Sequence, residues 1–572
     1  MIYLKKMTLA ELCKCSTEKY GNKNAFDIYR KGQVYNRLSF REFGVRARQI
    51  AALLGSLGIG NGDRVMLLAE NRPEWPAAYF GINLAGAVSV PVLAEFSVEQ
   101  IGNIARHAET AALCITSRTE AKALPALPAP DVPVIYLDRI EGGTIPVTIH
   151  NSSKFLPLRI PAFEDLPEIA EDSCASIIYT SGTTGRSKAV MLSNRNLLFC
   201  AKASRSLMKI YSRDRLLSII PLAHSYECTL GLLTSVMSGA STSYLDKTPS
   251  PAVLIPALQI LRPTAVLSVP LFIEKIYRNR ILPELKASRL YRFPPTRFLA
   301  VRVAGWKLLS ALGGAIRFFG IGGAPLAEDV ERFLRTVQFP YAPGYGLTEA
   351  APLVAGSAAY KFPYRSTGSV LKGVEVRIVP LVQDKTTDAA EGGKSAPTRR
   401  KETNAACRIN DGISAEGEIQ VRGPNIMLGY YKDEELTREV FTQDGWLKTG
   451  DLGCLDRKGR LYIHGRLKAL ILGPSGENIY PEEIESLLNT SSLIEDALVY
   501  PGEKGELIAL VVLSEKAKTM LAATAENLRE LKAKVNERLA GFSRISRIEV
   551  QDEPFEKTPT QKIKRFLYPH KQ

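Results

Sequence analysis

Residues 179–188, with the sequence YTSGTTGRSK, bring hydroxyl groups, two glycines and two cations together within ten positions. Glycines let backbone N–H groups turn toward an anion, hydroxyls add hydrogen-bond donors, and Arg186 and Lys188 supply positive charge. A plain polar turn would not need the paired cations. We therefore predict a loop that binds the phosphates of a nucleoside triphosphate, although its glycine and lysine spacing is not that of a Walker A motif.

Segments with related chemistry follow in order along the chain. They are GGAP at 322–325, YGLTE at 345–349, Trp446 with KTGD at 448–451, GRLK at 465–468, GENI at 476–479 with YPEE at 480–483, and TPTQKI at 558–563. Together with 179–188 they resemble the motifs of the adenylate-forming superfamily, which includes acyl-CoA synthetases, the adenylation domains of peptide synthetases and firefly luciferase. The resemblance implies that the protein joins a carboxylic acid to the α-phosphate of ATP and releases pyrophosphate.

The resemblance also assigns nucleotide-binding roles to residues of these segments. They are Thr180, Ser181, Gly182, Thr183, Thr184, Gly185, Lys188, Gly323, Ala324, Tyr345, Gly346, Thr348, Asp451 and Arg466. Since magnesium prefers carboxylate oxygen together with phosphate and water, Glu349 is the expected Mg²⁺ ligand, and Thr184 could join it. Two alternatives stay open, because Asp451 follows a glycine and could only cap a turn, and Tyr345 could be a core residue.

Near the C-terminus, Lys562 lies in the basic run KTPTQKIKR, where a lysine is ordinarily a solvated surface group. The resemblance singles out Lys562 as the catalytic cation that bridges carboxylate and phosphate oxygens during adenylation. It also implies that Lys468 is the hinge about which a tail domain turns between the two half-reactions. Gly473 and Gly476 would then line a narrow channel for the pantetheine arm of CoA.

Residues 221–227, PLAHSYE, resemble the acyl-pocket entrance of long-chain fatty acyl-CoA synthetases. His224 is the candidate catalytic residue beside the substrate carboxylate, and the alternative is a hydrogen-bonded core histidine. We expect a long-chain fatty acid–CoA ligase that uses ATP, CoA and Mg²⁺ and forms AMP. An enzyme that transfers the acyl group to acyl carrier protein, and an inactive acyl- or nucleotide-binding protein, are the two alternatives.

The sequence also predicts the strands and helices that position these residues. Apolar runs at 64–70, 112–116, 176–180, 216–221, 264–270 and 315–323 alternate with amphipathic stretches. Such alternation predicts parallel sheets covered by helices. Segment 38–60 carries Ser39 and Glu42 at capping-box spacing, which predicts a helix start. Residues 75–94 are uncharged, but their prolines and glycines favour a helix, a turn and a short strand over a membrane-spanning helix.

After about residue 365 the pattern changes to closely spaced strands with glycine turns, and helix-type segments return in the tail. We predict an α/β fold with a large domain over 1–465 and a small mobile α+β domain over 466–572. Within the large domain, residues 366–465 form a β-subdomain. Residues 381–415 are polar and without periodicity, which indicates an insertion loop.

Composition excludes several classes of protein. The chain has 572 residues, a net charge of +15 and eight scattered cysteines without a CxxC pair, which argues against a zinc site or a disulfide framework. No secretory signal is visible, so we expect a cytoplasmic protein. Six cations among aromatic residues at 286–307 are typical of an ordinary amphipathic surface helix, and peripheral contact with an anionic membrane is the alternative. No nucleic-acid-binding motif is found, and a homodimer is a further expectation.

Overall fold

The computed structural model describes residues 2–140, 143–150, 152–181, 187–381, 414–472, 478–502, 506–519, 524–557 and 563–568. The chain divides into two compact units. Unit 1 comprises Met1–Tyr364, Leu371–Val374 and Gly423–Glu439, and unit 2 comprises Arg365–Val370, Glu375–Arg422 and Val440–Gln572. The strands of the expected β-subdomain thus group with the tail, and the predicted boundary at 466 stays a prediction. Most of the predicted insertion, 382–413, lies outside the described residues.

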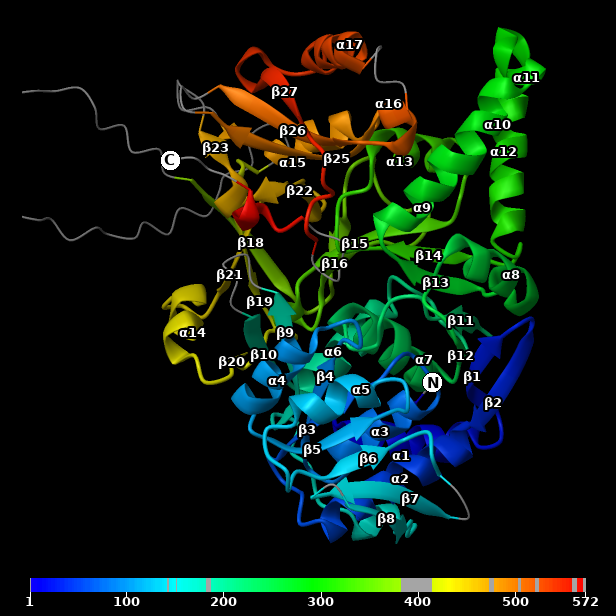
Figure 1. Ribbon diagram of the computed structural model, residues 1–572, viewed down its shortest axis with the longest axis vertical. Helices are drawn as coiled ribbons and strands as arrows, with labels where there is room; N and C mark the ends of the chain where they lie inside the picture. The colour runs from blue at the N-terminus through cyan, green and yellow to red at the C-terminus, as the bar shows by residue number, and fades with distance from the viewer. Residues whose placement is uncertain are drawn as a thin grey trace, which may run out of the picture. The chain divides into compact units, whose positions relative to one another are not determined.

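Unit 1 contains two sheets (Figure 1). In order across the first sheet lie β20 (Gly429–Tyr430), β10 (Ser187–Ser193), β9 (Cys174–Ser181), β4 (Val88–Val92), β3 (Arg64–Leu68), β5 (Thr110–Ile115), β6 (Val134–Tyr136), β7 (Thr144–Ile149) and β8 (Ser152–Pro157). The strands from β9 to β6 are parallel, and antiparallel pairs flank them on both sides.

The second sheet of unit 1 is likewise parallel in its centre. It runs β16 (Leu353–Gly356), β15 (Tyr341–Gly346), β14 (Phe318–Ile321), β13 (Ala265–Ser268), β11 (Arg215–Leu217), β12 (Ser241–Leu245), β1 (Asn24–Arg30) and β2 (Gln33–Ser39). From β15 to β1 each neighbouring pair is parallel. The predicted parallel sheets are therefore confirmed, and the carboxyl ends of these strands, where ligands of such sheets bind, share one edge.

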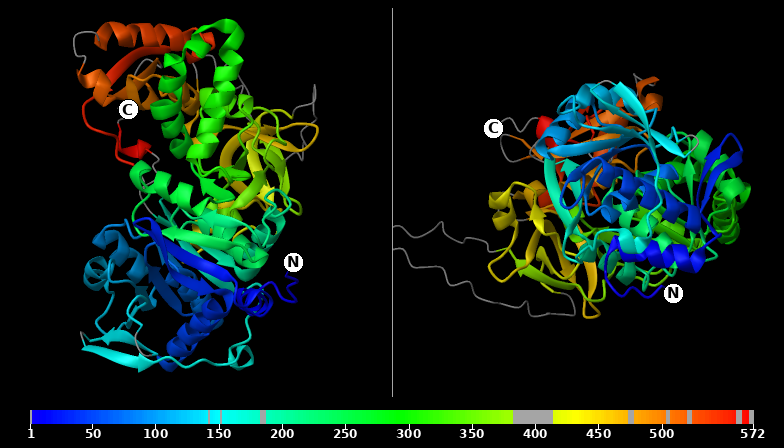
Figure 2. Two further views of the ribbon diagram at one scale, coloured as in Figure 1. Left: turned by 90° about the vertical axis from the view of Figure 1, so that its right-hand side faces the viewer. Right: turned by 90° about the horizontal axis from the view of Figure 1, so that it is seen from below.

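Helices connect the strands of both sheets (Figure 2). They are α1 (Leu9–Tyr20), α2 (Phe40–Ser56), α3 (Glu74–Leu84), α4 (Val98–His107), α5 (Glu120–Ala123), α6 (Asn194–Ser204), α7 (Thr234–Ser238), α8 (Pro251–Leu261), α9 (Pro270–Ile276), α10 (Leu282–Ala287), α11 (Arg289–Arg292), α12 (Arg297–Ala311) and α13 (Glu328–Thr336). Two π-helical segments, Glu227–Leu233 and Tyr277–Ile281, interrupt the series.

Local sequence signals explain where several helices begin. The Ser39 side chain accepts a hydrogen bond from the backbone N–H of Glu42, and the Glu42 carboxylate accepts one from the backbone N–H of Ser39. This is the predicted capping box, which satisfies two backbone donors that a helix start leaves unpaired. Helix α6 begins with the same arrangement, formed by Ser193 and Asn196.

The uncharged stretch 75–94 folds as predicted into helix, turn and strand. Every residue of α3 is buried, and β4 follows within the first sheet. A helix buried on all sides needs no polar face, which explains why the stretch carries no charge. Among the described residues, no helix is long and apolar enough to cross a membrane.

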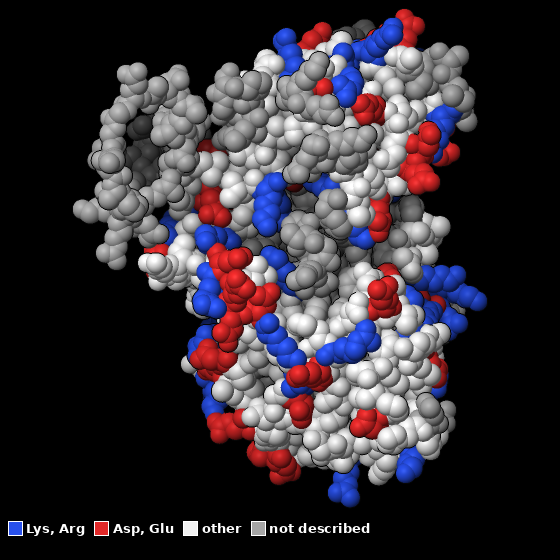
Figure 3. Space-filling model, turned by 60° about the vertical axis from the view of Figure 1, so that its left-hand side comes forward, with Lys and Arg blue, Asp and Glu red and all other residues white. Residues whose placement is uncertain are grey.

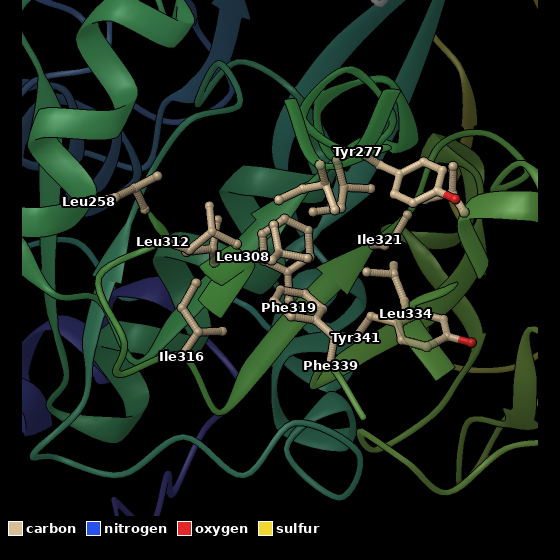
Figure 4. Packing of buried hydrophobic residues seen from close by; sticks show 14 of the residues in the cluster. Leu258, Tyr277, Leu308, Leu312, Ile316, Phe319, Ile321, Leu334, Phe339 and Tyr341 are labelled. Atoms are coloured by element: carbon tan, nitrogen blue, oxygen red, sulfur yellow. The ribbon is translucent and has the colours of Figure 1, made fainter. Parts of the chain in front are cut away.

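One of the hydrophobic clusters of unit 1 lies where helices pack on β14. Leu308 of α12 and Leu312, which follows that helix, point toward Phe319 of β14, and Leu334 of α13 lies in the same cluster (Figure 4). Each such side chain stabilises the fold by about 1.5–3 kcal/mol when fully buried. This packing fixes β14 and β15, whose carboxyl ends carry candidate site residues.

Unit 2 contains an antiparallel sheet and a smaller mixed sheet. The first runs β18 (Glu375–Pro380), β19 (Gly417–Arg422), β21 (Leu447–Leu455), β22 (Arg460–Arg466) and β17 (Gly368–Val370). The second consists of β25 (Ile494–Pro501), β26 (Leu507–Leu513) and β27 (Ile545–Gln551), with α15 (Pro481–Leu488), α16 (Glu515–Thr519) and α17 (Thr524–Asn536). A two-stranded sheet of β23 (Ile471–Leu472) and β24 (Asn478–Ile479) lies between them in the chain, and α14 (Glu434–Val440) spans the change from unit 1 to unit 2.

Candidate active site

A β-hairpin carries the predicted phosphate loop. Strand β9 pairs antiparallel with β10, so that Thr180 faces Lys188, and the Thr180 hydroxyl donates to the Lys188 carbonyl at 3.5 Å. Gly182, Thr183, Thr184 and Gly185, together with the side chain of Ser181, lie outside the described residues. The segment that follows the predicted strand at 176–180 is thus a second strand and not a helix, and it places Lys188 at the exit of the loop.

Three side chains of unit 1 bring the phosphate loop and the predicted metal ligand together. The Tyr430 hydroxyl donates a hydrogen bond to Oε1 of Glu349 at 2.9 Å. Lys188 Nζ lies 5.1 Å from the centroid of the Tyr430 ring, a cation–π arrangement. Tyr430 therefore orients the carboxylate through its hydroxyl, and the Lys188 ammonium lies over the ring of the same tyrosine.

The backbone around Tyr430 is fixed by pairing with two predicted motifs. Strand β20 pairs with β10, and the N–H of Tyr431 donates to the Ala189 carbonyl at 2.8 Å. The N–H of Met427 donates to the carbonyl of Glu349 at 2.9 Å. Sequence reasoning missed this segment, GPNIMLGYY at 423–431, although an asparagine and two glycines between a strand and a helix were a signal for an unusual turn.

The carboxyl ends of β14 and β15 carry the predicted adenine-side residues. Gly323 and Ala324 are exposed in the turn after β14, whereas Tyr345 in β15 is 9% exposed. A Cβ atom on Gly346 would lie 1.9 Å from the Pro352 carbonyl oxygen, so the tight β15–β16 hairpin requires glycine there. Thr348 and Glu349 lie in the connection between the two strands of this hairpin.

The PLAHSYE segment meets the YGLTE segment through hydroxyls. The hydroxyls of Ser225 and Thr348 lie 3.3 Å apart, which brings His224, the residue before Ser225, to the predicted site. The Tyr226 side chain packs against the end of β14, because a Cβ atom on Gly320 would lie 3.1 Å from its hydroxyl oxygen and one on Gly322 would lie 3.3 Å from its Cζ atom. The sequence offered no reason to single out Tyr226, whose partners are about 95 residues distant.

Glu227, the next residue, is a buried acid that no predicted role explains. It is 3% exposed, and its Oε2 atom has no hydrogen-bond partner among the described residues. Burial raises the pKa of Glu227 to about 8. The folded chain therefore holds a proton on this carboxyl over a pH range in which the unfolded chain has released it.

We predict that Glu227→Gln removes a pH-dependent loss of stability. The raised pKa means that the folded state binds the proton more tightly than the unfolded state does. The free energy of unfolding of the wild type should therefore fall by on the order of 4 kcal/mol between pH 4.5 and pH 8. Glutamine does not titrate, so the stability of the variant relative to the wild type should increase as the pH rises over this interval. Apparent melting temperatures at pH 5 and pH 8 measure the difference. The exposed Glu434→Gln is the control, and parallel pH profiles for wild type and Glu227→Gln would contradict the assignment.

In unit 2, β21 and β22 pair the two predicted ribose residues. Asp451 faces Arg466 across the strands, and Arg466 Nε lies 3.2 Å from Asp451 Oδ1. Asp451 is 5% exposed, and its backbone N–H donates to the Thr449 hydroxyl at 3.1 Å. The ion pair fixes one carboxylate oxygen in place. That both residues act on a ribose stays a prediction.

Trp446, from the same motif, has a structural environment. Its ring lies 4.6 Å from the guanidinium of Arg377 and 4.6 Å from that of Arg422. Arg377 also pairs with Asp444 at 2.6 Å. These contacts hold the loop before β21, and they explain the tryptophan without a ligand.

Lys468 is exposed in a short turn between β22 and β23. On either side of it, His464 and Tyr480 both hydrogen-bond to Oε1 of Glu416. The hydrogen bonds of the His464 ring to Cys454 and to Glu416 raise its pKa to about 10, so His464 carries a positive charge at neutral pH. Gly473, Gly476 and Lys562 lie outside the described residues, so the CoA channel and the catalytic lysine stay predictions.

Most of the chain matches two protein-family models. Residues 14–431 match the AMP-binding enzyme family, and residues 469–568 match the C-terminal domain of AMP-binding enzymes. The chain belongs to the AMP-binding enzyme family. The resemblance to adenylate-forming enzymes that the motifs predict is thereby confirmed.

Relatives within the AMP-binding family differ in the acid that their names give. The chain is 30% identical over 578 residues to the long-chain-fatty-acid–CoA ligase FadD15 of Mycobacterium bovis, with 92% of this chain and 90% of that protein covered. It is 28% identical over 588 residues to 4-coumarate–CoA ligase 2 of Petroselinum crispum, with 99% and 94% covered. The chain is therefore a member of the adenylate-forming acyl-CoA ligase family, and the acid that it activates is a separate question.

The fold of this AMP-binding enzyme matches solved structures throughout. ATP-bound MatB from Rhodopseudomonas palustris superimposes with a TM-score of 0.71 at 22% identity, and the match covers 98% of each chain. The predicted adenylate-forming fold, with a large α/β domain and a small C-terminal domain, is thus confirmed.

The residues that the structure describes are compatible with a magnesium ion bound largely by its nucleotide. No group of three or more His, Cys, Asp or Glu side chains among the described residues could hold a metal ion. Mg²⁺ ordinarily keeps several waters and binds through one or two carboxylates plus substrate phosphates. Glu349, held by Tyr430 with one oxygen, fits that pattern as a single protein carboxylate.

Proposed function

We propose that this protein is an AMP-forming ligase that activates a long-chain fatty acid and transfers it to CoA. The observation that carries the proposal is the cluster of Lys188, Tyr430 and Glu349, which sets a lysine and an oriented carboxylate at the exit of a hydroxyl-rich loop. The similarity over nearly full length to a relative named as a long-chain fatty acid ligase supports the choice of acid.

The first half-reaction joins two anions. A carboxylate oxygen of the fatty acid attacks the α-phosphorus of ATP, the bond to the bridging oxygen of the β-phosphate breaks, and pyrophosphate leaves with the electron pair. Repulsion between the carboxylate and the triphosphate opposes this approach, so catalysis is chiefly charge neutralisation and alignment. Lys188 and the backbone of the loop would neutralise phosphate charge, and Thr348, 3.3 Å from Ser225, would donate to the α-phosphate.

Glu349 would hold the magnesium ion, assisted by Thr184, and the ion supplies charge neutralisation at the phosphates when bound. Tyr430 keeps the carboxylate in place through its 2.9 Å hydrogen bond. Asp451 would accept hydrogen bonds from the ribose hydroxyls, and its ion pair with Arg466 fixes the carboxylate for that task. His224 would lie beside the fatty acid carboxylate.

The second half-reaction forms the thioester. The CoA sulfur, having lost its proton, attacks the acyl carbonyl carbon, and AMP leaves with the oxygen that joined it to the acyl group. A turn about Lys468 would withdraw Lys562 and bring the segment with Gly473 and Gly476 to the acyl-adenylate. An acyl carrier protein presents the same phosphopantetheine thiol as CoA, so it remains the alternative acceptor.

We expect pyrophosphate release to rise with the chain length of the acid. Purified protein with ATP and magnesium is offered saturated fatty acids of graded length, with 4-coumarate as the competing acid class. Thioester formation is then measured with CoA and with acyl carrier protein. Preference for 4-coumarate would overturn the choice of acid, and absence of pyrophosphate release with every acid would favour the inactive binding protein.

A further inference from the structure

We propose that residues 282–311, here called the helical arm, bind the surface of an anionic lipid bilayer. The arm comprises α10, α11 and α12 and extends from the connection between β13 and β14 (Figures 1 and 2). Large apolar side chains project from it into solvent. Their exposed fractions are 50% for Leu290, 59% for Phe293, 61% for Phe298, 46% for Leu299, 51% for Val303 and 83% for Trp306.

The opposite face of α12 is packed against the core, so the outward side chains of this helix cannot turn inward. Ala300, Ala304 and Leu308 are buried in the cluster that also contains Phe319. A Cβ atom on Gly305 would lie 2.4 Å from Cβ of Val337, so the helix packs closely at that point. Leu299, Val303 and Trp306 are spaced as one outer face of the same helix. The exposed apolar face is therefore a fixed surface.

The charge of the arm selects its partner. Six cations and one acid lie in 282–311, and the six cations are all exposed. The one acid, Glu284, pairs with Lys307 at 3.1 Å, and Arg297 stacks on Tyr291 at 4.4 Å. On the face drawn in Figure 3, by contrast, basic and acidic side chains lie interspersed. The arm thus combines a local positive excess with exposed aromatic and aliphatic groups.

This combination fits a lipid surface better than a second copy of the chain. Two copies meeting through the arm would bring two like-charged surfaces together. An anionic bilayer instead offers headgroup phosphates to the cations and acyl chains to Phe298 and Trp306, with each basic residue near the surface contributing about 1 kcal/mol. The inference adds a partner to the proposed function, because a long-chain acid itself resides in membranes.

Tryptophan fluorescence tests the proposal directly. Of the three tryptophans, Trp75 and Trp446 are 0% and 8% exposed, so an environmental change on vesicle binding reports mainly on Trp306. Adding vesicles of equal parts phosphatidylcholine and phosphatidylglycerol should shift the emission to shorter wavelength, and raised salt should reverse much of the shift. Vesicles of phosphatidylcholine alone should have little effect.

Matched variants separate the arm from general surface charge. Arg292→Ala with Arg302→Ala should weaken vesicle binding about 30-fold, whereas Lys202→Ala with Lys209→Ala removes the same charge from exposed sites elsewhere and should have little effect. Trp306→Ala, assayed by vesicle flotation, should also bind weakly.

An unchanged spectrum with anionic vesicles would overturn the proposal, as would equal binding by both double variants. A shift without lipid that grows with protein concentration would point to a second copy instead. Because no ATP, acid or CoA is present, failure of the proposed ligase activity would leave this result unaffected.

Discussion

Replacing Lys562 by alanine is expected to lower acyl-adenylate formation by about 10²–10³-fold, the usual effect of removing one group that stabilises developing charge. Thioester formation from supplied acyl-adenylate should remain close to wild type. In that compound the acid is already joined to the α-phosphate, so no cation is needed to bring two anions together. Pyrophosphate exchange measures the first half-reaction, and release of AMP from added acyl-adenylate and CoA measures the second.

A neighbouring lysine provides the control. Lys564 lies in the same basic run, but its ammonium pairs with the Glu556 carboxylate, and Lys564→Ala should change neither half-reaction by more than a few-fold. Equal losses in both half-reactions for Lys562→Ala would show that the residue supports the fold and not the adenylation chemistry.

Glu349→Gln should lower pyrophosphate exchange by a similar factor, on the order of 10²-fold or more, since it removes the one carboxylate of the Lys188–Tyr430–Glu349 cluster. The amide keeps the shape and can still accept from Tyr430, so the fold should be retained. The magnesium concentration that gives half-maximal activity should rise, because the amide is the weaker ligand. A loss of activity without any change in magnesium dependence would contradict the metal-binding role.

Tyr430→Phe tests whether the Tyr430 hydroxyl positions the Glu349 carboxylate, while the carboxylate itself, as the proposed magnesium ligand, is kept. Loss of its hydrogen bond to a charged group should reduce activity about tenfold and should shift magnesium dependence in the same direction as Glu349→Gln. Tyr431→Phe is the control, because the Tyr431 ring contacts His107 and Lys432. If the two tyrosine variants behaved alike, Tyr430 would have no special part in orienting Glu349.

The features that were predicted correctly from the sequence are those that depend on residues close together in the chain. The capping box of Ser39 and Glu42, the buried strands and the α3–β4 unit follow from local pattern. Motif order identified the family. Tyr430 was missed because its partner Glu349 is 81 residues away, and no period or turn signal encodes that contact. The β9–β10 hairpin was missed because the short apolar run AVML after the loop was not recognised as a strand.

The shared carboxylate of Glu416 bears on how freely the proposed hinge can move. A turn at Lys468 that carried Tyr480 away would leave Glu416 still facing His464, which stays protonated at neutral pH. No unbalanced charge would appear, and water could replace the phenol at a loss of roughly 1–3 kcal/mol. Binding of a substrate can supply a free energy of this size. The tail can therefore prefer one orientation when no substrate is bound and still change to the other in each catalytic cycle.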